Sequence, residues 1–177
     1  MASVAEAPAP VALQEVKALL RIEGSAEDAL IAGFVRSAAG SCEAFTGRVL
    51  IAREERELVA ARGTWVRLSA APVRAIHAVA AVAADGAENA VAAEAYAVDV
   101  DAAGEGWVRV SAGAGVRRAA VRFTAGMAAD WNGVPEPLRQ GIVRLAAHLY
   151  AARDGAEGAP PAAVSALWRP WRRVRLG

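Results

Sequence analysis

The residues best suited to chemistry in this sequence are two histidines, His77 and His148, and a pair of aspartates, Asp99 and Asp101. A histidine acts as a general base or a metal ligand when a carboxylate, a nucleophile or another ligand lies beside it. The two histidines are far apart in the chain and show neither HExxH nor His-x-His spacing. We therefore expect both to be ordinary residues of a strand and a helix.

Two short motifs resemble ligand-binding loops but lack essential residues. The stretch DVDAAGEG from Asp99 begins like a calcium loop, yet Ala103 stands at the third ligand position and Val110 at the closing acidic position. The stretch GAGVRR from Gly113 has two of the three glycines of a dinucleotide fingerprint, but it precedes a predicted strand, which favours a hairpin turn. We expect neither calcium nor dinucleotide binding.

The remaining catalytic signatures are also missing from the sequence. Cys42 is the only cysteine, which excludes an intrachain disulfide and a cysteine-based zinc cluster. No Walker A motif, GxSxG or Cys-x-x-Cys occurs. We therefore expect no catalytic residue, no metal site and no cofactor, and we predict that the protein is not an enzyme.

The C-terminal stretch LWRPWRRVRLG is the most aromatic and most basic part of a chain whose net charge is only +1. It is too short to form a core of its own, so we expect its two tryptophans to be available to a partner. The predicted partner-binding arm consists of Leu167, Trp168, Arg169, Trp171, Arg172, Arg173, Val174, Arg175 and Leu176. We expect residues 11–155 to fold without it.

Two kinds of partner suit this arm. In the first, the tryptophans fill protein pockets and the arginines pair with carboxylates. In the second, the arginines contact phosphates and the tryptophans stack on bases, which makes the chain a nucleic-acid-binding module. No second basic patch or helix-turn-helix signal accompanies the arm, which favours a protein partner.

The elements that hold these residues follow from the spacing of apolar side chains. Residues 1–10 are small and Pro-containing and are predicted to be a flexible arm. Helical spacing predicts helices over 11–23 and 25–46, the second capped by Ser25 and ended by Gly47.

The middle of the chain changes from helical spacing to a period of two. Residues 48–125 are predicted to form a small antiparallel sheet, with turns marked by Gly, Asp, Asn and Pro. Helical spacing returns over 135–154, and 156–177 is predicted to be a hinge, a short helix and the C-terminal arm. The fold class is therefore α+β: a small helical bundle with an inserted antiparallel β-rich region and an extended C-terminal arm.

The sequence carries no predicted membrane segment. No stretch approaches the roughly 20 apolar residues that a membrane helix needs, and the first residues lack a cationic region followed by an apolar run. We expect neither a signal peptide nor contact with a membrane.

Several motifs, in order along the chain, resemble the head-tail connector (adaptor) family of tailed bacteriophages, which also occurs in gene transfer agents. The resemblance spans about residues 11–175. They are VKALLRI at 16–22, the acidic pair Glu27 and Asp28, EAFTGRVLI at 43–51, LSAAPVRAI at 68–76, YAVDV at 96–100, VRFTAG at 121–126 and VPEPLRQGIVRLAAHLYAAR at 134–153.

The resemblance implies a structural protein that forms a ring, with twelve copies expected, below the capsid portal. It implies three protein partners: the portal, a downstream tail or stopper component, and further copies of the chain. DNA would only pass through the central channel as cargo. The implied location is the neck of a phage-like particle assembled in the bacterial cytoplasm.

Overall fold

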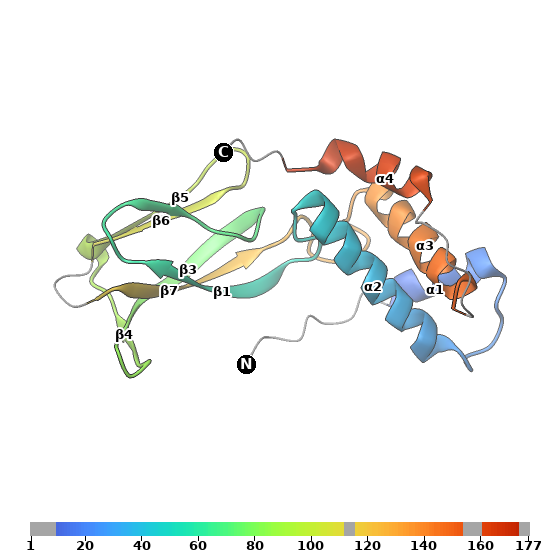
Figure 1. Cartoon of the computed structure of the whole chain (residues 1–177), viewed down its shortest axis with the longest axis horizontal. Coiled ribbons are helices and arrows are strands. Elements are labelled where there is room, and N and C mark those ends of the chain that lie inside the picture. The colour runs from blue at the N-terminus through green and yellow to red at the C-terminus, as the bar shows by residue number, and fades with distance from the viewer. Residues whose placement is uncertain (1–9, 112–115, 154–160, 174–177) are drawn as a thin grey trace. The chain divides into compact units, whose positions relative to one another are not determined.

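The computed structural model describes residues 10–111, 116–153 and 161–173 of the chain. Helices and antiparallel sheets make up two compact units, so the predicted α+β class is confirmed (Figure 1). Residues 1–51 and 128–177 belong to one unit, called here the helical unit, and residues 52–127 to the other, called the β unit.

The helical unit is a bundle whose helices bury one apolar face each. Its elements are α1 (Pro10–Leu20), α2 (Asp28–Thr46), α3 (Glu136–Ala151), α4 (Ala162–Trp168) and the short 3₁₀ helix η2 (Arg169–Trp171). α2 packs against α3, and α4 lies along α3 (Figure 1). The core residues recur at helical spacing, as the sequence predicts, and include Val16, Ile31, Val35, Leu138, Ile142 and Leu145.

Local sequence signals predict the C-terminal end of α2 correctly but not its N-terminal end. At the C-terminal end, Gly47 has φ 69° and ψ 23°, and its N–H donates to the Glu43 carbonyl over 2.8 Å, so the predicted glycine stop is confirmed. At the N-terminal end, the predicted Ser25 cap is wrong. The helix begins at Asp28, with Glu27 at the cap position and no side-chain capping bond.

Long-range partners explain where α2 begins. The Lys17 ammonium of α1 lies 2.6 Å from an Asp28 carboxylate oxygen and donates to the Gly24 carbonyl over 2.5 Å. The Tyr150 hydroxyl of α3 donates to the Glu27 carboxylate over 2.5 Å. Side chains of other helices thus bind both Glu27 and Asp28. Residues 25–27 form the turn that precedes α2 and places these two carboxylates beside Lys17 and Tyr150.

The β unit contains two antiparallel sheets. One has the order β1 (Arg53–Ala60), β7 (Arg118–Ala125), β3 (Val73–Val82) and β4 (Glu88–Ala90); the other has the order β2 (Trp65–Arg67), β6 (Gly106–Val110) and β5 (Tyr96–Val100). A 3₁₀ turn, η1 (Ala93–Ala95), precedes β5. The side chains buried within the unit come from both sheets and include Val59, Leu68, Val79, Val108, Val121 and Phe123.

The predicted single sheet is therefore a pair of sheets. β6 pairs only with β2 and β5, whereas β7 pairs with β1 and β3. The hairpin turn predicted from Gly113 falls on residues 113–115, which lie outside the described ranges; β6 before it and β7 after it belong to different sheets. Alternating spacing predicts strands but not which strands become neighbours, because pairing depends on contacts distant in sequence.

Candidate partner-binding surface

The histidines and aspartates considered for chemistry lie in strands, a helix and a turn. A ring nitrogen of His77 on β3 lies 2.6 Å from the Thr124 hydroxyl of β7, and His148 lies on α3. One Asp101 carboxylate oxygen accepts hydrogen bonds from the backbone N–H groups of Ala103 and Glu105, both over 2.9 Å. That aspartate therefore shapes the turn after β5, while Asp99 is exposed on the strand.

The described part of the chain was searched for groups of metal ligands and for membrane-spanning helices. Within it, no three His, Cys, Asp or Glu residues are grouped as metal ligands would be. The same residues include no helix that is both long and apolar enough to cross a bilayer. Cys42 is buried in α2, and this burial raises the pKa of its thiol to about 12, which keeps it protonated and unreactive.

The predicted arm is described from Leu167 to Arg173, whereas Val174, Arg175 and Leu176 lie outside the described residues. Leu167 and Trp168 end α4, and Arg169 to Trp171 form η2. Pro161 precedes α4 and lacks the N–H that a first helical turn leaves unpaired, which suits the start of a helix. Much of the predicted arm is thus regular structure.

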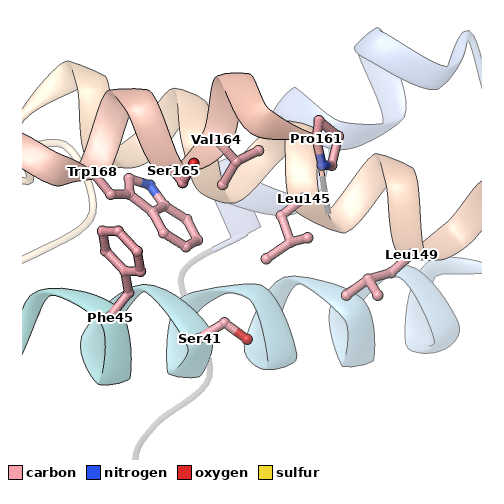
Figure 2. Close-up of a pocket in the computed structure, with 8 residues that line it drawn as sticks. All are labelled: Ser41, Phe45, Leu145, Leu149, Pro161, Val164, Ser165 and Trp168. Atoms are coloured by element: carbon pink, nitrogen blue, oxygen red, sulfur yellow. The ribbon is translucent and has the colours of Figure 1, made fainter. Parts of the chain in front are cut away.

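The expectation that both tryptophans are available to a partner is wrong for Trp168, which is only 4% exposed. Its indole N–H donates to the Leu138 carbonyl over 3.3 Å. Its ring lies beside that of Phe45 (Figure 2), with 5.9 Å between the two ring centroids. A Cβ added at Gly141 would lie 2.8 Å from the indole Cε2. The missing side chain of Gly141 therefore provides the space in which this indole packs.

A groove of about 390 Å³ lies beside the same indole. Its walls come from α2, α3 and α4, and Figure 2 shows Phe45, Leu145, Leu149 and Val164 around it. This apolar packing holds α4 against the bundle. α4 has only seven residues, too few to form a stable helix alone, so the sequence pattern by itself does not predict that it packs there.

Two hydrogen bonds to the main chain hold the residues that follow α4. The Arg48 Nε donates to the Trp171 carbonyl over 3.1 Å, and the Arg173 N–H donates to the Thr46 carbonyl over 2.7 Å. Thr46 is the last residue of α2, where helix carbonyls have no partner within the helix. The C-terminal segment thus donates a hydrogen bond to the Thr46 carbonyl, which has no partner within α2.

A second, shallower cleft faces outward from the same segment. Its volume is about 440 Å³, and Pro137, Ala166, Leu167, Pro170 and Trp171 line it; we call it the Trp171 cleft. Arg169 and Arg172 flank Pro170 and Trp171 in the chain, and both are exposed. The Arg172 guanidinium lies 5.4 Å from the Phe45 ring centroid in a cation–π arrangement.

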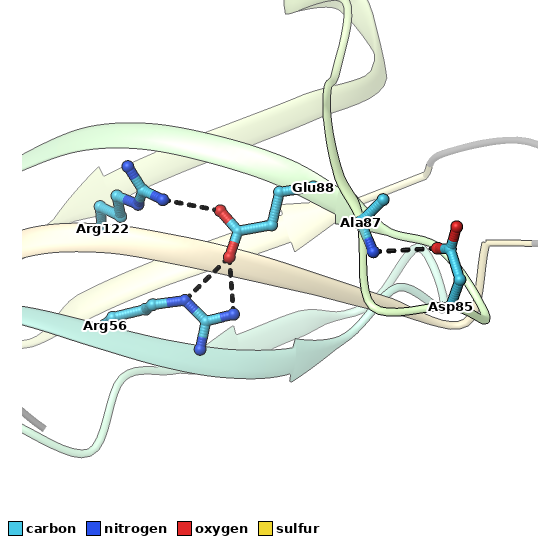
Figure 3. Close-up of polar contacts among 5 residues, drawn as sticks. All are labelled: Arg56, Asp85, Ala87, Glu88 and Arg122. Atoms are coloured by element: carbon cyan, nitrogen blue, oxygen red, sulfur yellow. Dashed lines mark hydrogen bonds and ion pairs between the residues drawn. The ribbon is translucent and has the colours of Figure 1, made fainter. Parts of the chain in front are cut away.

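An ion cluster on the β unit was not predicted from the amino-acid sequence. Glu88 of β4 accepts hydrogen bonds from Arg56 of β1 over 2.7 and 2.9 Å and from Arg122 of β7 over 2.9 Å (Figure 3). The hydrogen bond from Arg56 is the main reason that the pKa of Glu88 lies below its usual range. β4 has only three residues, too few for alternation to predict it.

Comparison with known proteins finds a matching family. Residues 10–100 match the family model of the phage gp6-like head-tail connector protein. No curated protein matches the chain.

Solved structures match over nearly the whole length. A chain from the neck of an empty gene transfer agent (GTA) particle, computed with C6 symmetry, is 33% identical with a TM-score of 0.78; the match covers 99% of this chain and 95% of that one. A chain from the virion of a native GTA particle is 32% identical with a TM-score of 0.75, over 97% and 95% of the two chains.

A third chain comes from the neck of a native GTA particle computed with C12 symmetry. It is 29% identical, with a TM-score of 0.70, and the match covers 97% of this chain and 96% of that one. The matching family model and these near-complete matches agree with the motifs noted in the sequence. The chain belongs to the phage gp6-like head-tail connector family.

Proposed function

We propose that this protein forms a ring below the capsid portal of a phage-like particle, joins the portal to the next tail component and surrounds a channel for DNA. The family is one of structural head-tail connectors, and a structural connector role follows from membership. The observation that carries the finer proposal is the match, over 99% of this chain, to a chain from a particle neck.

Symmetry supports the ring. The neck structures that this chain resembles were computed with C6 and C12 symmetry. A closed ring repeats one head-to-tail interface, so each subunit needs two different complementary surfaces. We propose twelve copies, located in the neck of a particle assembled in the bacterial cytoplasm, with the portal on one side and a tail or stopper component on the other.

We propose no catalytic activity for the chain. Both histidines belong to regular elements, and the Cys42 thiol is buried with a raised pKa, so it is a poor nucleophile. The two clefts beside Trp168 and Trp171 are lined mainly by apolar side chains. Such surfaces suit association between proteins better than bond-breaking chemistry.

The segment from Leu167 to Leu176 is our proposed contact with the portal. One such segment offers little area, but a ring presents a copy from every subunit. Linking many weak contacts raises the overall affinity by orders of magnitude without any new contact. The portal is itself a ring in this proposal, so every subunit can engage at once.

The alternative of a nucleic-acid-binding module is less well supported. Stacking on bases needs exposed aromatic faces, and Trp168 is buried against α3. Trp171 is half-buried, and its neighbours in the cleft are aliphatic. In our proposal DNA passes through the ring without a specific site on this segment.

Mixing the purified protein with its cognate portal tests the proposal. We expect negative-stain images of a ring stacked on the portal, together with weak and nonspecific DNA binding. Contact between four arginines and duplex phosphates would instead give a log–log salt slope of about −3.6, from roughly −0.9 per contact. Tight DNA binding at physiological salt without capture by the portal would contradict the connector proposal.

A further inference from the structure

We infer that neighbouring subunits of the ring meet through their helical units, with Leu19 of one copy packed in the groove beside Trp168 of the next copy. This inference rests on the proposed function, because it assigns the two different surfaces that a head-to-tail ring requires. The first surface is the groove of about 390 Å³ between α2, α3 and α4. The second is the outward side of α1.

The groove provides an apolar surface at the outside of the bundle. Phe45, Leu145, Leu149 and Val164 line it, together with Ser41, which is exposed on α2 (Figure 2). Well-packed contacts between proteins place an apolar side chain of one partner in a concave, apolar site of the other. The groove therefore suits an aliphatic side chain of a second copy.

Leu19 is the counterpart on α1. Its side chain is 54% exposed, the largest fraction among the exposed large apolar side chains of the described residues. Ala12 and Val16 of the same helix are fully buried, so the core uses another side of α1. Leu19 lies beside Val143 of α3 in a shallow cleft of about 270 Å³. Two neighbouring apolar side chains thus form a small patch rather than a single exposed leucine.

The positions of the two surfaces require a second copy. No residue of α1 lines the groove, and α1 and α4 pack at different places on the pair formed by α2 and α3 (Figure 1). A subunit that fills its neighbour's groove therefore keeps its own groove open for a third copy. Head-to-tail contacts of this kind close into rings, which suits the C6 and C12 symmetry of the neck structures that the chain resembles.

The charges add a weaker contribution of the same sense. The Arg172 guanidinium lies over an aromatic wall of the groove and forms no ion pair with another described residue. One helical turn before Leu19, the Glu15 carboxylate lies 3.8 Å from Arg139. Docking of Leu19 brings this carboxylate toward Arg172 of the next copy. Arg144 lines the same cleft as Glu15, so the charge contribution is small and the apolar contact dominates.

Mass measurements on the purified protein, alone and with its cognate portal, test this interface. We expect the wild type to form a ring in at least one of these conditions. Leu19→Arg and Ser41→Arg each place a long charged side chain in the contact. Each should raise the concentration needed for assembly at least about tenfold, because burial of the leucine is lost. Both residues are exposed, so the melting temperatures of the free variants should stay close to that of the wild type.

Mixing the two variants tests whether the two surfaces bind each other. A Leu19→Arg copy keeps an intact groove, and a Ser41→Arg copy keeps an intact Leu19. Where the wild type assembles, the mixture should therefore give pairs of copies that do not extend, whereas each variant alone should stay monomeric. A mixture without such pairs would overturn the interface.

Leu58→Arg on β1 is the matched control, because Leu58 is 45% exposed on the β unit. Its assembly should need a concentration within about twofold of that of the wild type. Assembly of the wild type together with unchanged assembly of Leu19→Arg and Ser41→Arg would overturn this interface and leave the ring proposal standing. A wild type that forms no ring, alone or on the portal, would defeat the ring proposal as well.

Discussion

Gly47 illustrates how a single residue determines where a helix ends. Its φ of 69° lies in the left-handed region, which a β-branched side chain strongly disfavours. A Cβ at this position would lie 3.5 Å from the Arg173 Cβ, so space alone would permit a side chain. The cost of a substitution therefore comes from the backbone conformation.

We predict that Gly47→Val lowers the free energy of unfolding by more than about 1 kcal/mol. Gly40→Val is the matched control, because Gly40 lies inside α2 with nothing within 4 Å of an added Cβ. That change should be neutral or slightly stabilising, since valine is a better helix former than glycine. Urea denaturation measures both; equal midpoints for the two variants would contradict the role of the left-handed conformation.

The Glu88 carboxylate gives a residue-level prediction about pH. Hydrogen bonds from Arg56 and Arg122 lower its pKa in the folded state. A lowered pKa stabilises the fold above the ordinary glutamate range, and this contribution disappears as pH falls through the folded-state value. We predict that Glu88→Gln lowers the melting temperature at pH 7 and that the difference from the wild type vanishes in acid.

Glu54→Gln serves as the control for that series, because Glu54 is exposed on β1 and forms no ion pair with another described residue. Its melting temperature should follow that of the wild type across the pH range. Added salt should reduce the effect at Glu88, since the cluster is exposed to solvent. A difference that persists unchanged below pH 3 would assign the effect to something other than the carboxylate charge.

At the scale of elements, α4 belongs to the helical core. Val164 and Trp168 are buried against α2 and α3. We therefore predict that truncation after Gly155 lowers the free energy of unfolding by about 3 kcal/mol or more, the range for losing one large core aromatic residue. Residues 11–155 would then still fold without the C-terminal arm, as expected from the sequence, but with lower stability.

Truncation after Arg173 is the matched control, because it removes none of the described contacts of α4 and η2. Its thermal unfolding should match that of the full chain. An unchanged melting temperature after truncation at Gly155 would mean that the packing of Trp168 contributes nothing to stability.

At the scale of the whole molecule, the chain crosses between its two units at two segments that lie side by side. Ile51 and Ala128 form a parallel bridge, and the Ala128 N–H donates to the Leu50 carbonyl over 3.0 Å. The ends of the β unit are thus close together in space. We predict that replacing residues 52–127 with a short Gly-Ser linker leaves a cooperatively folding helical bundle.

Circular dichroism at 222 nm during heating measures this outcome. The separate fragment 52–127 should give a β-type spectrum, because all seven strands pair within it. A linker variant that loses helical signal gradually, without a sharp transition, would show that the bundle needs the β unit to fold.

The amino-acid sequence alone determines the regular elements and the family. The stripe Leu138, Ile142 and Leu145, the stop at Gly47 and most of the strands depend on near neighbours in the chain, so spacing and turn residues predict them. The motifs between residues 11 and 175 carried the resemblance to head-tail connectors, and the comparisons confirm it.

Only the tertiary structure decided which residues are available to a partner. Trp168 is buried because Leu138, 30 positions earlier, offers a carbonyl and Gly141 offers space. The start of α2 and the division into two sheets likewise depend on partners distant in sequence. Local patterns describe the conformation of a segment, whereas burial depends on which surfaces meet after folding, and that is a property of the whole chain.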